Sequence, residues 1–328
     1  MRAAVLGGGS WGTALACHLT RCGHQVKLWV REPEIAREIN EAGSNSTYLS
    51  GISLPPGIFA SCDLAAVSAN AEALAVVVPS QFCRGVLQKL AAVGPREALL
   101  VSATKGFELD SLERMSEVAA AELPGTRVAA LSGPSFALEV AREQPTAVVM
   151  ASLDLAAAEL LQRAFSSRSF RVYVSADVVG VELGGALKNV IAIAAGIVDG
   201  LGYGHNTVAA LITRGLAEMS RLAIALGGRA ETLAGLAGLG DLVLTCTGAL
   251  SRNRALGQAL GRGQSLEQTL AGSKMVVEGV RTTLAACAIA ERAGIEMPIA
   301  GQMRDVLYRG KSPGEAVDEL MLRSLKRE

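Results

Sequence analysis

Residues 7–12 read Gly7-Gly8-Gly9-Ser10-Trp11-Gly12 and fit the pattern G-x-G-x-x-G. The pattern alone is common, but here it directly follows a compact apolar run, Ala3 to Gly7, which is typical of a buried strand. A helical stretch continues to about Cys22, and a second apolar strand, Val26 to Val30, comes next. Strand, glycine-rich turn, helix and strand in this order indicate the first unit of a dinucleotide-binding fold.

The three spaced glycines each have a physical reason in such a fold. Gly7 permits the tight turn, Gly9 lets the backbone approach a pyrophosphate, and Gly12 allows the helix to pack closely on the sheet. The free N–H groups and the positive dipole at the helix N-terminus favour phosphate. We therefore predict a dinucleotide at this loop. A glycine-rich turn without a ligand is the alternative.

The first half of the chain continues this alternation of strands and helices. Its short apolar runs are continuous, which indicates strands buried on both faces. Such strands, alternating with helical patterns, predict a parallel, doubly wound sheet and hence an α/β fold of the Rossmann type. The further strands that we expect are Leu74 to Val78, Ala98 to Ser102, Arg127 to Leu131, Thr146 to Met150 and Phe170 to Val174.

The texture of the sequence changes after Asp177. Strand patterns stop, and alanine, glycine and leucine recur at helical spacing. We expect a dinucleotide-binding Rossmann domain in residues 1–177 and an all-α substrate and catalytic domain in residues 178–328. A capping box, Ser312-Pro313-Gly314-Glu315, opens the last helix. The helices that we expect are Val178 to Val198, Thr207 to Leu226, Ser251 to Leu260, Met275 to Ala293 and Ser312 to Leu325.

The composition disfavours several classes of protein. Lysine plus arginine and aspartate plus glutamate balance at 31 each. Nucleic-acid-binding proteins usually have a basic excess, so we expect no nucleic-acid partner. The six cysteines form no CxxC pair and no metal-ligand cluster, so we expect no metal site and interpret them as small buried hydrophobes. A catalytic thiol or a disulfide is the alternative.

We expect no targeting or membrane segment. Gly7 to Gly9 interrupt the first apolar run, so that it does not resemble a signal peptide. The most apolar later stretch, Val190 to Val198, is followed by Asp199 and is too short to span a bilayer. We therefore predict a cytoplasmic protein with no membrane partner.

The residues after the second strand bear on the choice of nucleotide. NAD-binding proteins usually place an acidic residue there, which bonds the ribose hydroxyls, whereas an arginine can pair with the 2′-phosphate of NADP. Here Arg31 stands first and Glu32 follows. We predict that NADP is preferred and that NAD is also accepted. The alternative is that Arg31 is only a solvated surface charge.

Two strand ends carry candidate site residues. Open α/β sheets bind ligands beyond the carboxyl ends of their strands. One expected strand leads into Thr104-Lys105-Gly106, and another leads into Ser132-Gly133-Pro134-Ser135. We expect a lysine and a hydroxyl to face the same crevice, with an ordinary loop cation as the alternative for Lys105.

A lysine and an asparagine, Lys188-Asn189, interrupt an unusually apolar helix. A buried lysine needs a partner or a polar cavity, and burial lowers its pKa, which suits a general acid or base. The alternatives are a snorkelling lysine or a structural pair with Glu182. Of the three histidines, His18 and His24 flank the nucleotide helix and are interpreted as structural. His205, in a glycine-rich turn, is a weaker alternative acid.

Two further segments add polar groups. Asp241 lies between apolar residues in Leu239-Gly240-Asp241-Leu242, and Ser251-Arg252-Asn253-Arg254 opens a helix. A serine N-cap, free backbone amides and arginines together predict a local phosphate site. The alternative is a plain capped helix on the surface.

Together these residues resemble the NAD(P)-dependent glycerol-3-phosphate dehydrogenases of the bacterial type, over nearly the whole chain. The resemblance implies an active site between a Rossmann domain and a helical domain. It also implies reversible hydride transfer between dihydroxyacetone phosphate and sn-glycerol 3-phosphate, a product that usually feeds phospholipid synthesis. Beyond the dinucleotide loop, the segments that carry it are Ala103-Thr104-Lys105-Gly106, Ser132-Gly133-Pro134-Ser135-Phe136-Ala137, Leu183-Gly184-Gly185-Ala186-Leu187-Lys188-Asn189-Val190, Gly238-Leu239-Gly240-Asp241-Leu242, Ser251-Arg252-Asn253-Arg254 and Val276-Val277-Glu278-Gly279.

The resemblance also implies residue roles. Lys188 would be the proton donor to the carbonyl, or the base in the reverse direction. The implied substrate contacts are Lys105, Gly133, Ser135, Lys188, Asp241, Ser251, Arg252 and Asn253. The implied cofactor contacts, beside Gly7, Gly9 and Gly12, are Ser10, Trp11, Arg31, Tyr48, Lys105, Ala137, Arg252, Val276 and Glu278.

Two other functions stay open on the sequence alone. A related two-domain, NADP-dependent reductase of keto or hydroxy acids predicts a carboxylate site without a phosphate requirement, and the helix start at Ser251 argues against it. A non-catalytic NADP sensor predicts tight binding without turnover and leaves a buried Lys188 unexplained. The apolar helical domain is also compatible with a homodimer.

Overall fold

The computed structural model describes residues 1–94, 98–271 and 275–324. In this part of the chain, eight strands form one sheet in the order β3-β2-β1-β4-β5-β6-β7-β8. This order, with helices on both faces, confirms the predicted Rossmann-type α/β fold. The strands are β1 (Arg2–Leu6), β2 (Gln25–Trp29), β3 (Ile58–Ser61), β4 (Ala73–Val76), β5 (Leu99–Ser102), β6 (Val128–Ser132), β7 (Thr146–Ala151) and β8 (Phe170–Ser175).

Two features of the sheet differ from the expectation. The prediction that every strand is parallel is wrong for β7 and β8, because β7 runs antiparallel to β6 and β8 runs parallel to β7. The connection between β6 and β7 contains only the five-residue helix α6 (Ala137–Ala141), in place of the longer helix that usually crosses over to a parallel neighbour. The sequence analysis also missed β3, because this edge strand has only four residues and follows Pro55-Pro56-Gly57.

Alternate residues of β1 explain why both faces of the sheet are covered. Ala3 and Val5 belong to one apolar cluster with Leu15 of α1 (Ser10–Arg21), whereas Ala4 and Leu6 belong to another. That second cluster contains residues of α4 (Ser80–Val93) and α5 (Met115–Glu122). The strands are thus buried on both sides, as their continuous apolar runs predict.

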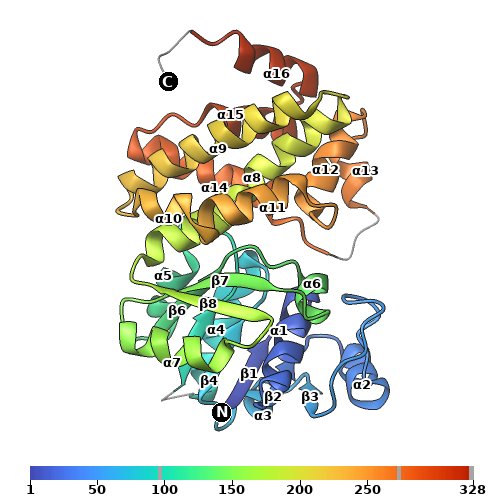
Figure 1. Ribbon diagram of the computed structural model, residues 1–328, viewed down its shortest axis with the longest axis vertical. Helices are drawn as coiled ribbons and strands as arrows, with labels where there is room; N and C mark the ends of the chain where they lie inside the picture. The colour runs from blue at the N-terminus through green and yellow to red at the C-terminus, as the bar shows by residue number, and fades with distance from the viewer. Residues whose placement is uncertain (95–97, 272–274, 325–328) are drawn as a thin grey trace.

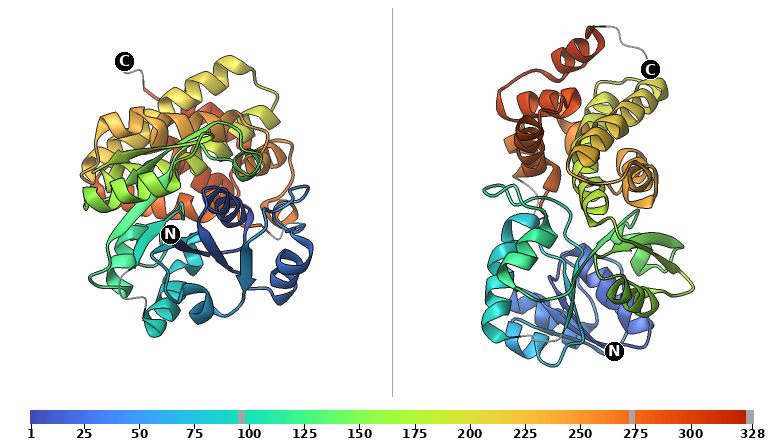
Figure 2. Two further views of the ribbon diagram at one scale, coloured as in Figure 1. Left: turned by 60° about the horizontal axis from the view of Figure 1, so that its bottom comes forward. Right: turned by 90° about the vertical axis from the view of Figure 1, so that its left-hand side faces the viewer.

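A helical layer stands above the carboxyl ends of the parallel strands β1 to β6, as Figure 1 and the right-hand view of Figure 2 show. Its central element is α8 (Val178–Gly200), which is buried along nearly its whole length. Around α8 pack α9 (His205–Ala225), α11 (Asp241–Thr247), α12 (Arg252–Gly261) and α14 (Glu278–Ala293). By length and composition α8 would pass for a membrane span, but its apolar window is wholly buried inside the protein.

Glycine explains how closely α8 and α12 approach. A Cβ on Gly196 would lie 2.0 Å from the carbonyl oxygen of Arg254, and one on Gly257 would lie 2.0 Å from that of Ile193. Any side chain at either position would force the helices apart, since such distances are far below van der Waals contact. This seam fixes the N-terminal end of α12 beside α8.

The remaining helices complete the two layers. The predicted start of α14 at Met275 is wrong by three positions. The last helix ends at Met321, before the predicted Leu325, which itself lies outside the described residues. The last helix, α16, does begin with the predicted capping box at Ser312. The other helical elements are α2 (Pro33–Ala42), α3 (Leu64–Ser68), α7 (Leu155–Phe165), α10 (Ala230–Ala234), the π-helix η1 (Leu236–Gly240), α13 (Leu266–Leu270), α15 (Pro298–Tyr308) and α16 (Pro313–Met321).

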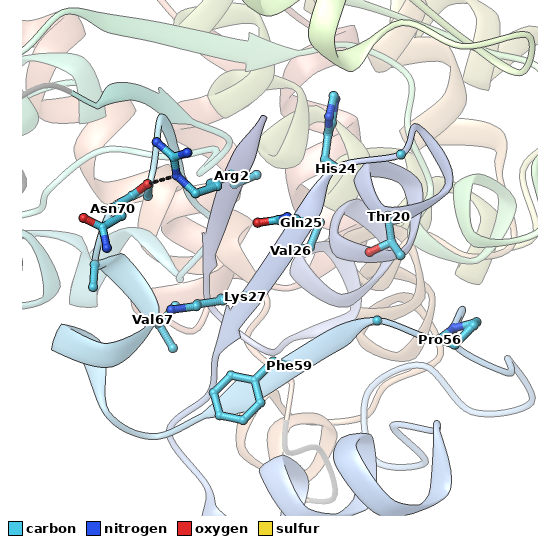
Figure 3. Close-up of a pocket in the computed structure, with 15 residues that line it drawn as sticks. Arg2, Thr20, His24, Gln25, Val26, Lys27, Pro56, Phe59, Val67 and Asn70 are labelled. Atoms are coloured by element: carbon cyan, nitrogen blue, oxygen red, sulfur yellow. Dashed lines mark hydrogen bonds between the residues drawn. The ribbon is translucent and has the colours of Figure 1, made fainter.

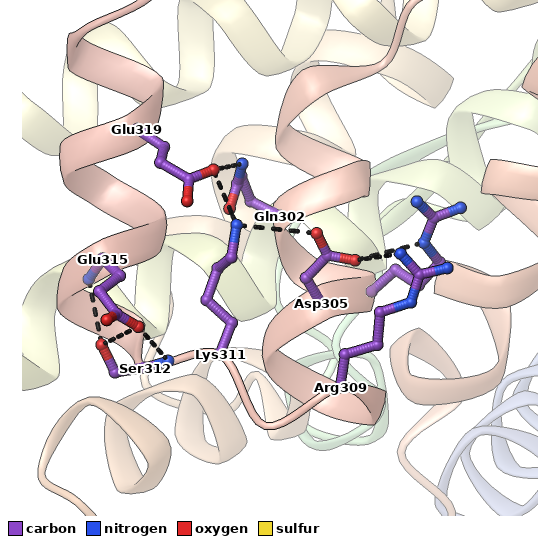
Figure 4. Close-up of polar contacts among 8 residues, drawn as sticks. Gln302, Asp305, Arg309, Lys311, Ser312, Glu315 and Glu319 are labelled. Carbon is purple, nitrogen blue, oxygen red and sulfur yellow. Dashed lines mark hydrogen bonds and ion pairs between the residues drawn. The ribbon is translucent and has the colours of Figure 1, made fainter.

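Polar contacts fasten α16 to α15 (Figure 4). The Lys311 ammonium donates to Gln302 Oε1 at 3.0 Å and to Glu319 Oε2 at 2.7 Å. It also lies 3.7 Å from Asp305, which pairs with Arg309 at 3.1 Å. One lysine in the connection therefore bridges both helices, far from the sheet.

Candidate active site

The dinucleotide loop follows β1, at the edge of the sheet that faces the helical layer (Figure 1). Gly7 has φ +130°, and a Cβ there would lie 2.7 Å from the carbonyl oxygen of Val77. A Cβ on Gly12 would lie 1.8 Å from the carbonyl oxygen of Gly7, whereas one on Gly9 would meet no atom within 4 Å. The first and third glycines thus serve close packing, and the second leaves its backbone open to a ligand.

The start of α1 fits a dinucleotide phosphate. Its N-cap, Gly9, offers no side-chain acceptor, and its first turn has no acidic residue, so the first amides and the positive helix dipole face the loop unopposed. The buried indole N–H of Trp11 also has no hydrogen-bond partner among the described residues. An unpaired buried donor beside a glycine cradle fits an acceptor-rich ligand.

A buried ionic cluster lies where α8 meets the ends of β5 and β6. Lys188 is only 6% exposed and Asp241 is fully buried. The Lys188 ammonium bonds Oδ1 of Asp241, and the Lys105 ammonium lies 2.7 Å from Oδ2. Lys105 also donates to the carbonyl oxygen of Gly133 at 3.0 Å. Three residues that the sequence analysis singled out separately therefore form one site.

Glycines on α8 permit this assembly. A Cβ on Gly184 would lie 2.4 Å from the carbonyl oxygen of Ala237 in η1, and one on Gly185 would lie 2.4 Å from Oγ of Ser132. The helix therefore touches η1 on one side and the end of β6 on the other. One turn later, Lys188 meets Asp241, the first residue after η1.

The proposed alternative partner of Lys188 is wrong. Glu182 bonds Arg114, with Oε2 at 2.6 Å from Nη1, and accepts from the backbone N–H of Ser116 at 2.8 Å. Six residues separate Glu182 from Lys188, which is about 240° of rotation around a helix of 3.6 residues per turn. The two side chains therefore leave α8 on different faces.

The electrostatics of the cluster favour easy proton exchange. Burial and, to a smaller extent, the positive charge of Lys105 lower the pKa of Lys188, the carboxylate of Asp241 opposes both, and the net result is a pKa of about 7. Two lysines share one carboxylate, so the cluster carries a net positive charge when both are protonated. A proton donor with a pKa near neutrality, beside a second cation, suits protonation of an oxygen that becomes negative.

The start of α12 provides a second polar group of residues. Ser251 is the N-cap and accepts from the backbone N–H of Arg254, as predicted from its residue type. The Arg252 guanidinium donates to the carbonyl oxygen of Val276 at 2.8 Å. The amide of Asn253 is held by protein groups, Asn189 and the N–H of Gly279.

The sequence analysis missed the partner of Glu278. Ser80, the first residue of α4, donates its N–H at 3.0 Å and its hydroxyl at 2.8 Å to this carboxylate. The carboxylate thus takes the place of a side-chain cap for α4 and joins the sheet layer to α14. A Cβ on Gly106 would lie 2.8 Å from Oγ of Ser80, so the loop of Lys105 packs against this bond.

The remaining predicted residues divide between the site and the scaffold. Ser135 donates to the carbonyl oxygen of Gly133 at 3.0 Å, and Ala137 begins α6. His205 is the exposed first residue of α9 rather than part of the turn. His18 and His24 contact the carbonyl oxygens of Phe165 and Ala164, each at 2.7 Å, which is a structural role.

The cysteines and Arg254 belong to the scaffold. Cys17, Cys22, Cys62, Cys83, Cys246 and Cys287 are all free. Four of them are buried, as predicted, but Cys22 is half-buried and Cys62 is exposed. Arg254, beside the predicted phosphate site, pairs instead with Asp199 at 2.7 Å.

A cavity of about 590 Å³ lies at the opposite edge of the sheet (Figure 3). Its lining includes Arg2, Lys27 and Phe59, near the starts of β1, β2 and β3. Arg2 and Lys27 already donate to the backbone carbonyl oxygens of Asn70 and Ala66. Because open α/β sheets bind ligands at the carboxyl ends of their strands, we do not locate the active site in this cavity.

The similarity to known proteins extends over nearly the whole chain. Residues 2–158 match the family described as NAD-dependent glycerol-3-phosphate dehydrogenase N-terminus, and residues 177–318 match the corresponding C-terminus. The chain is 54% identical to glycerol-3-phosphate dehydrogenase [NAD(P)+] of Geobacter sp. strain M21, covering 99% of this chain and 98% of the relative. It is 53% identical to the enzyme of the same name from Geobacter sulfurreducens, covering 100% and 98%.

Solved structures give the same result. The crystal structure of glycerol-3-phosphate dehydrogenase from Coxiella burnetii superimposes with a TM-score of 0.95 at 42% identity, covering 98% of this chain and 99% of that one. A ketopantoate reductase from Ralstonia eutropha superimposes with a TM-score of 0.63 at 16% identity, covering 97% and 100%. The second likeness is one of fold alone.

Proposed function

The chain belongs to the NAD-dependent glycerol-3-phosphate dehydrogenase family, and on that premise we propose which of its residues carry the reaction. It is an NAD(P)-dependent oxidoreductase that interconverts dihydroxyacetone phosphate and sn-glycerol 3-phosphate. We propose that Lys188 is the general acid and base, that Asp241 holds its ammonium in place, and that Lys105 adds a second positive charge. The observation that carries this proposal is the buried cluster of these three side chains at the strand ends.

When bound, the nicotinamide cofactor supplies the hydride chemistry. Negative charge develops on the ketone oxygen during reduction, and Lys188 stabilises that charge and then donates its proton. In the oxidation direction its neutral amine accepts the alcohol proton. Asp241 keeps the Lys188 ammonium in place, and Lys105 adds a second positive charge from the opposite side of the carboxylate.

The surrounding residues divide between the two ligands. The open backbone at Gly9 and the first amides of α1 support a role for the dinucleotide loop in holding the pyrophosphate. The capped N-terminus of α12, with Arg252 beside it, suits the substrate phosphate. Arg252 also bonds the segment before α14 through Val276, which supports its implied contact with both ligands.

A spectrophotometric assay tests this function. We expect oxidation of NADPH or NADH with dihydroxyacetone phosphate, and very poor turnover of unphosphorylated dihydroxyacetone, since remote binding energy positions the carbonyl. Turnover of 2-keto acids with no response to dihydroxyacetone phosphate would favour the keto-acid reductase. Tight cofactor binding without turnover of any ketone would favour the sensor.

Four predictions remain proposals: the domain boundary, the cellular location, the assembly and the metabolic role. We propose that the chain divides into domains at residues 177 and 178, supported by the strands that end at Ser175 and the helices that start at Val178. We also propose a cytoplasmic protein, a homodimeric assembly, and a supply of glycerol phosphate for phospholipid synthesis. Fractionation, sedimentation and lipid analysis of a depleted strain test the last three.

A further inference from the structure

Three side chains converge at the carboxyl end of β2. One oxygen of the Glu32 carboxylate, Oε1, accepts from Nε of Arg31 at 3.1 Å and from Nη2 at 2.5 Å. The same oxygen accepts from the hydroxyl of Tyr48 at 3.3 Å. The side chain of Glu32 is 22% exposed, whereas that of Arg31 is 72% exposed. The carboxylate is thus the fixed centre of the group, and the guanidinium is its solvent-facing partner.

This position is where a Rossmann fold distinguishes the two nicotinamide dinucleotides. An acidic residue after the second strand bonds the ribose hydroxyls of NAD, whereas an arginine accommodates the 2′-phosphate of NADP. Here both residue types are present, and they are bonded to each other. Glu32 opens α2 without a side-chain cap bond, so its carboxylate is not needed to begin that helix.

The two ligands place opposite demands on this pair. The hydrogen bonds that Glu32 accepts from Arg31 and Tyr48 all go to Oε1, so without a 2′-phosphate Oε2 can accept from a ribose hydroxyl while Oε1 keeps both partners. With a 2′-phosphate, the dianion meets a carboxylate of like charge and competes with it for the same guanidinium. The pair therefore assists NAD(H) and opposes NADP(H), against the preference that Arg31 alone predicts.

We propose that Glu32 is a specificity-determining residue that allows this enzyme to use NAD(H) and reduces its preference for NADP(H). The inference rests on the proposed function, because it assumes that the adenosine end of the cofactor reaches the end of β2. The ligand that it favours is a dinucleotide whose adenosine ribose carries free hydroxyls.

Direct binding to the purified protein tests this without turnover. We would measure dissociation constants of NADPH and NADH by fluorescence, and of 2′,5′-ADP and 5′-ADP by calorimetry, for wild type and Glu32→Gln. The ratio of the NADH constant to the NADPH constant should rise by about tenfold or more, as for loss of a charged hydrogen bond. The ratio of the 5′-ADP constant to the 2′,5′-ADP constant should rise as well, because the effect arises at the ribose.

Glu41→Gln is the matched control, since it removes the same charge from the exposed far end of α2. Glu32→Ala should repeat the shift of Glu32→Gln, and Glu41→Gln should leave the ratio within about twofold of wild type. An unchanged ratio in both Glu32 variants, or an equal shift in the control, would overturn the proposal. If wild type bound neither dinucleotide, the proposed function would fall as well.

Discussion

Two ion pairs near the carboxyl ends of the strands have opposite surroundings. At the end of β2, Arg31 and Glu32 are 72% and 22% exposed. Between α8 and α11, the side chains of Lys188 and Asp241 are 8% and 1% exposed. Water screens the first pair, so its energy is small and a ligand can rearrange it. The second pair is desolvated, so each charge depends on the other and proton affinity becomes adjustable.

The largest effect that we expect comes from the buried pair. Lys188→Ala should lower kcat for dihydroxyacetone phosphate reduction by about 10²–10⁴-fold, as for loss of a general acid. NADPH binding should remain, because the dinucleotide loop is untouched. Steady-state kinetics and fluorescence titration measure the two quantities.

Lys89→Ala, on the exposed face of α4, is the matched control and should retain kcat. A folded Lys188→Ala protein with near-normal kcat would contradict the assignment. Lys105, the second ammonium on Asp241, would then be the next residue to test.

The carboxylate should matter for stability as well. Asp241→Asn leaves two buried or half-buried ammonium groups without their shared counterion. The free energy of unfolding should fall by about 3–5 kcal/mol, typical of breaking a buried ion pair from one side. Urea denaturation measures it, with the exposed Asp110→Asn as control, which should stay within about 0.5 kcal/mol. Equal losses in both variants would show that burial gives Asp241 no special role.

Local patterns were sufficient for most strands of the sheet and for the separate site segments. The glycine loop, most strands and the apolar α8 follow from residue type and spacing, because each is decided within a few residues. Lys188 was recognisable for the same reason, as a charge on an apolar helix. Helix geometry could also have excluded Glu182 as the partner of Lys188, because the six-residue spacing places the two side chains on different faces.

Contacts between distant segments were not predictable in this way. Neither residue type nor spacing indicates that Glu278 meets Ser80, because 198 positions separate them. The shared carboxylate of Asp241 likewise depends on how η1 packs against Gly184. The antiparallel direction of β7 also does not follow from its own apolar run, because a run of this kind fits either direction.

Arg252 is exposed, as Arg31 is, and it stands at the capped start of α12. Arg252→Ala should lower kcat/KM for dihydroxyacetone phosphate by about 10–150-fold, the range for a hydrogen bond to a charged group. The advantage over unphosphorylated dihydroxyacetone should narrow accordingly. Arg262→Ala, at the other end of α12, is the control. Equal use of both ketones by wild type would remove the phosphate site from this helix.

The pH profile should report the buried pair. Burial lowers the pKa of Lys188 to about 7, and the reduction needs the protonated form. The kcat for reduction should therefore be level below about pH 7 and fall about tenfold per pH unit above it. The oxidation direction needs the neutral amine, so its kcat should rise with pH through the same range. If kcat in the two directions changed with pH in the same way, Lys188 would not be the group that exchanges the proton.

The smallest effect should come from the exposed pair. Arg31→Ala removes an ion pair that water already screens, so the free energy of unfolding should change by less than about 1 kcal/mol. The same variant should weaken NADPH by about tenfold, the lower end for a hydrogen bond to a charged group, and NADH much less. Urea denaturation and fluorescence titration of one preparation measure both. Because Arg31 and Asp241 each belong to an ion pair, a loss of stability in Arg31→Ala as large as in Asp241→Asn would mean that solvent exposure does not separate the two regions. Equal weakening of NADPH and NADH would mean that Arg31 does not contact the 2′-phosphate.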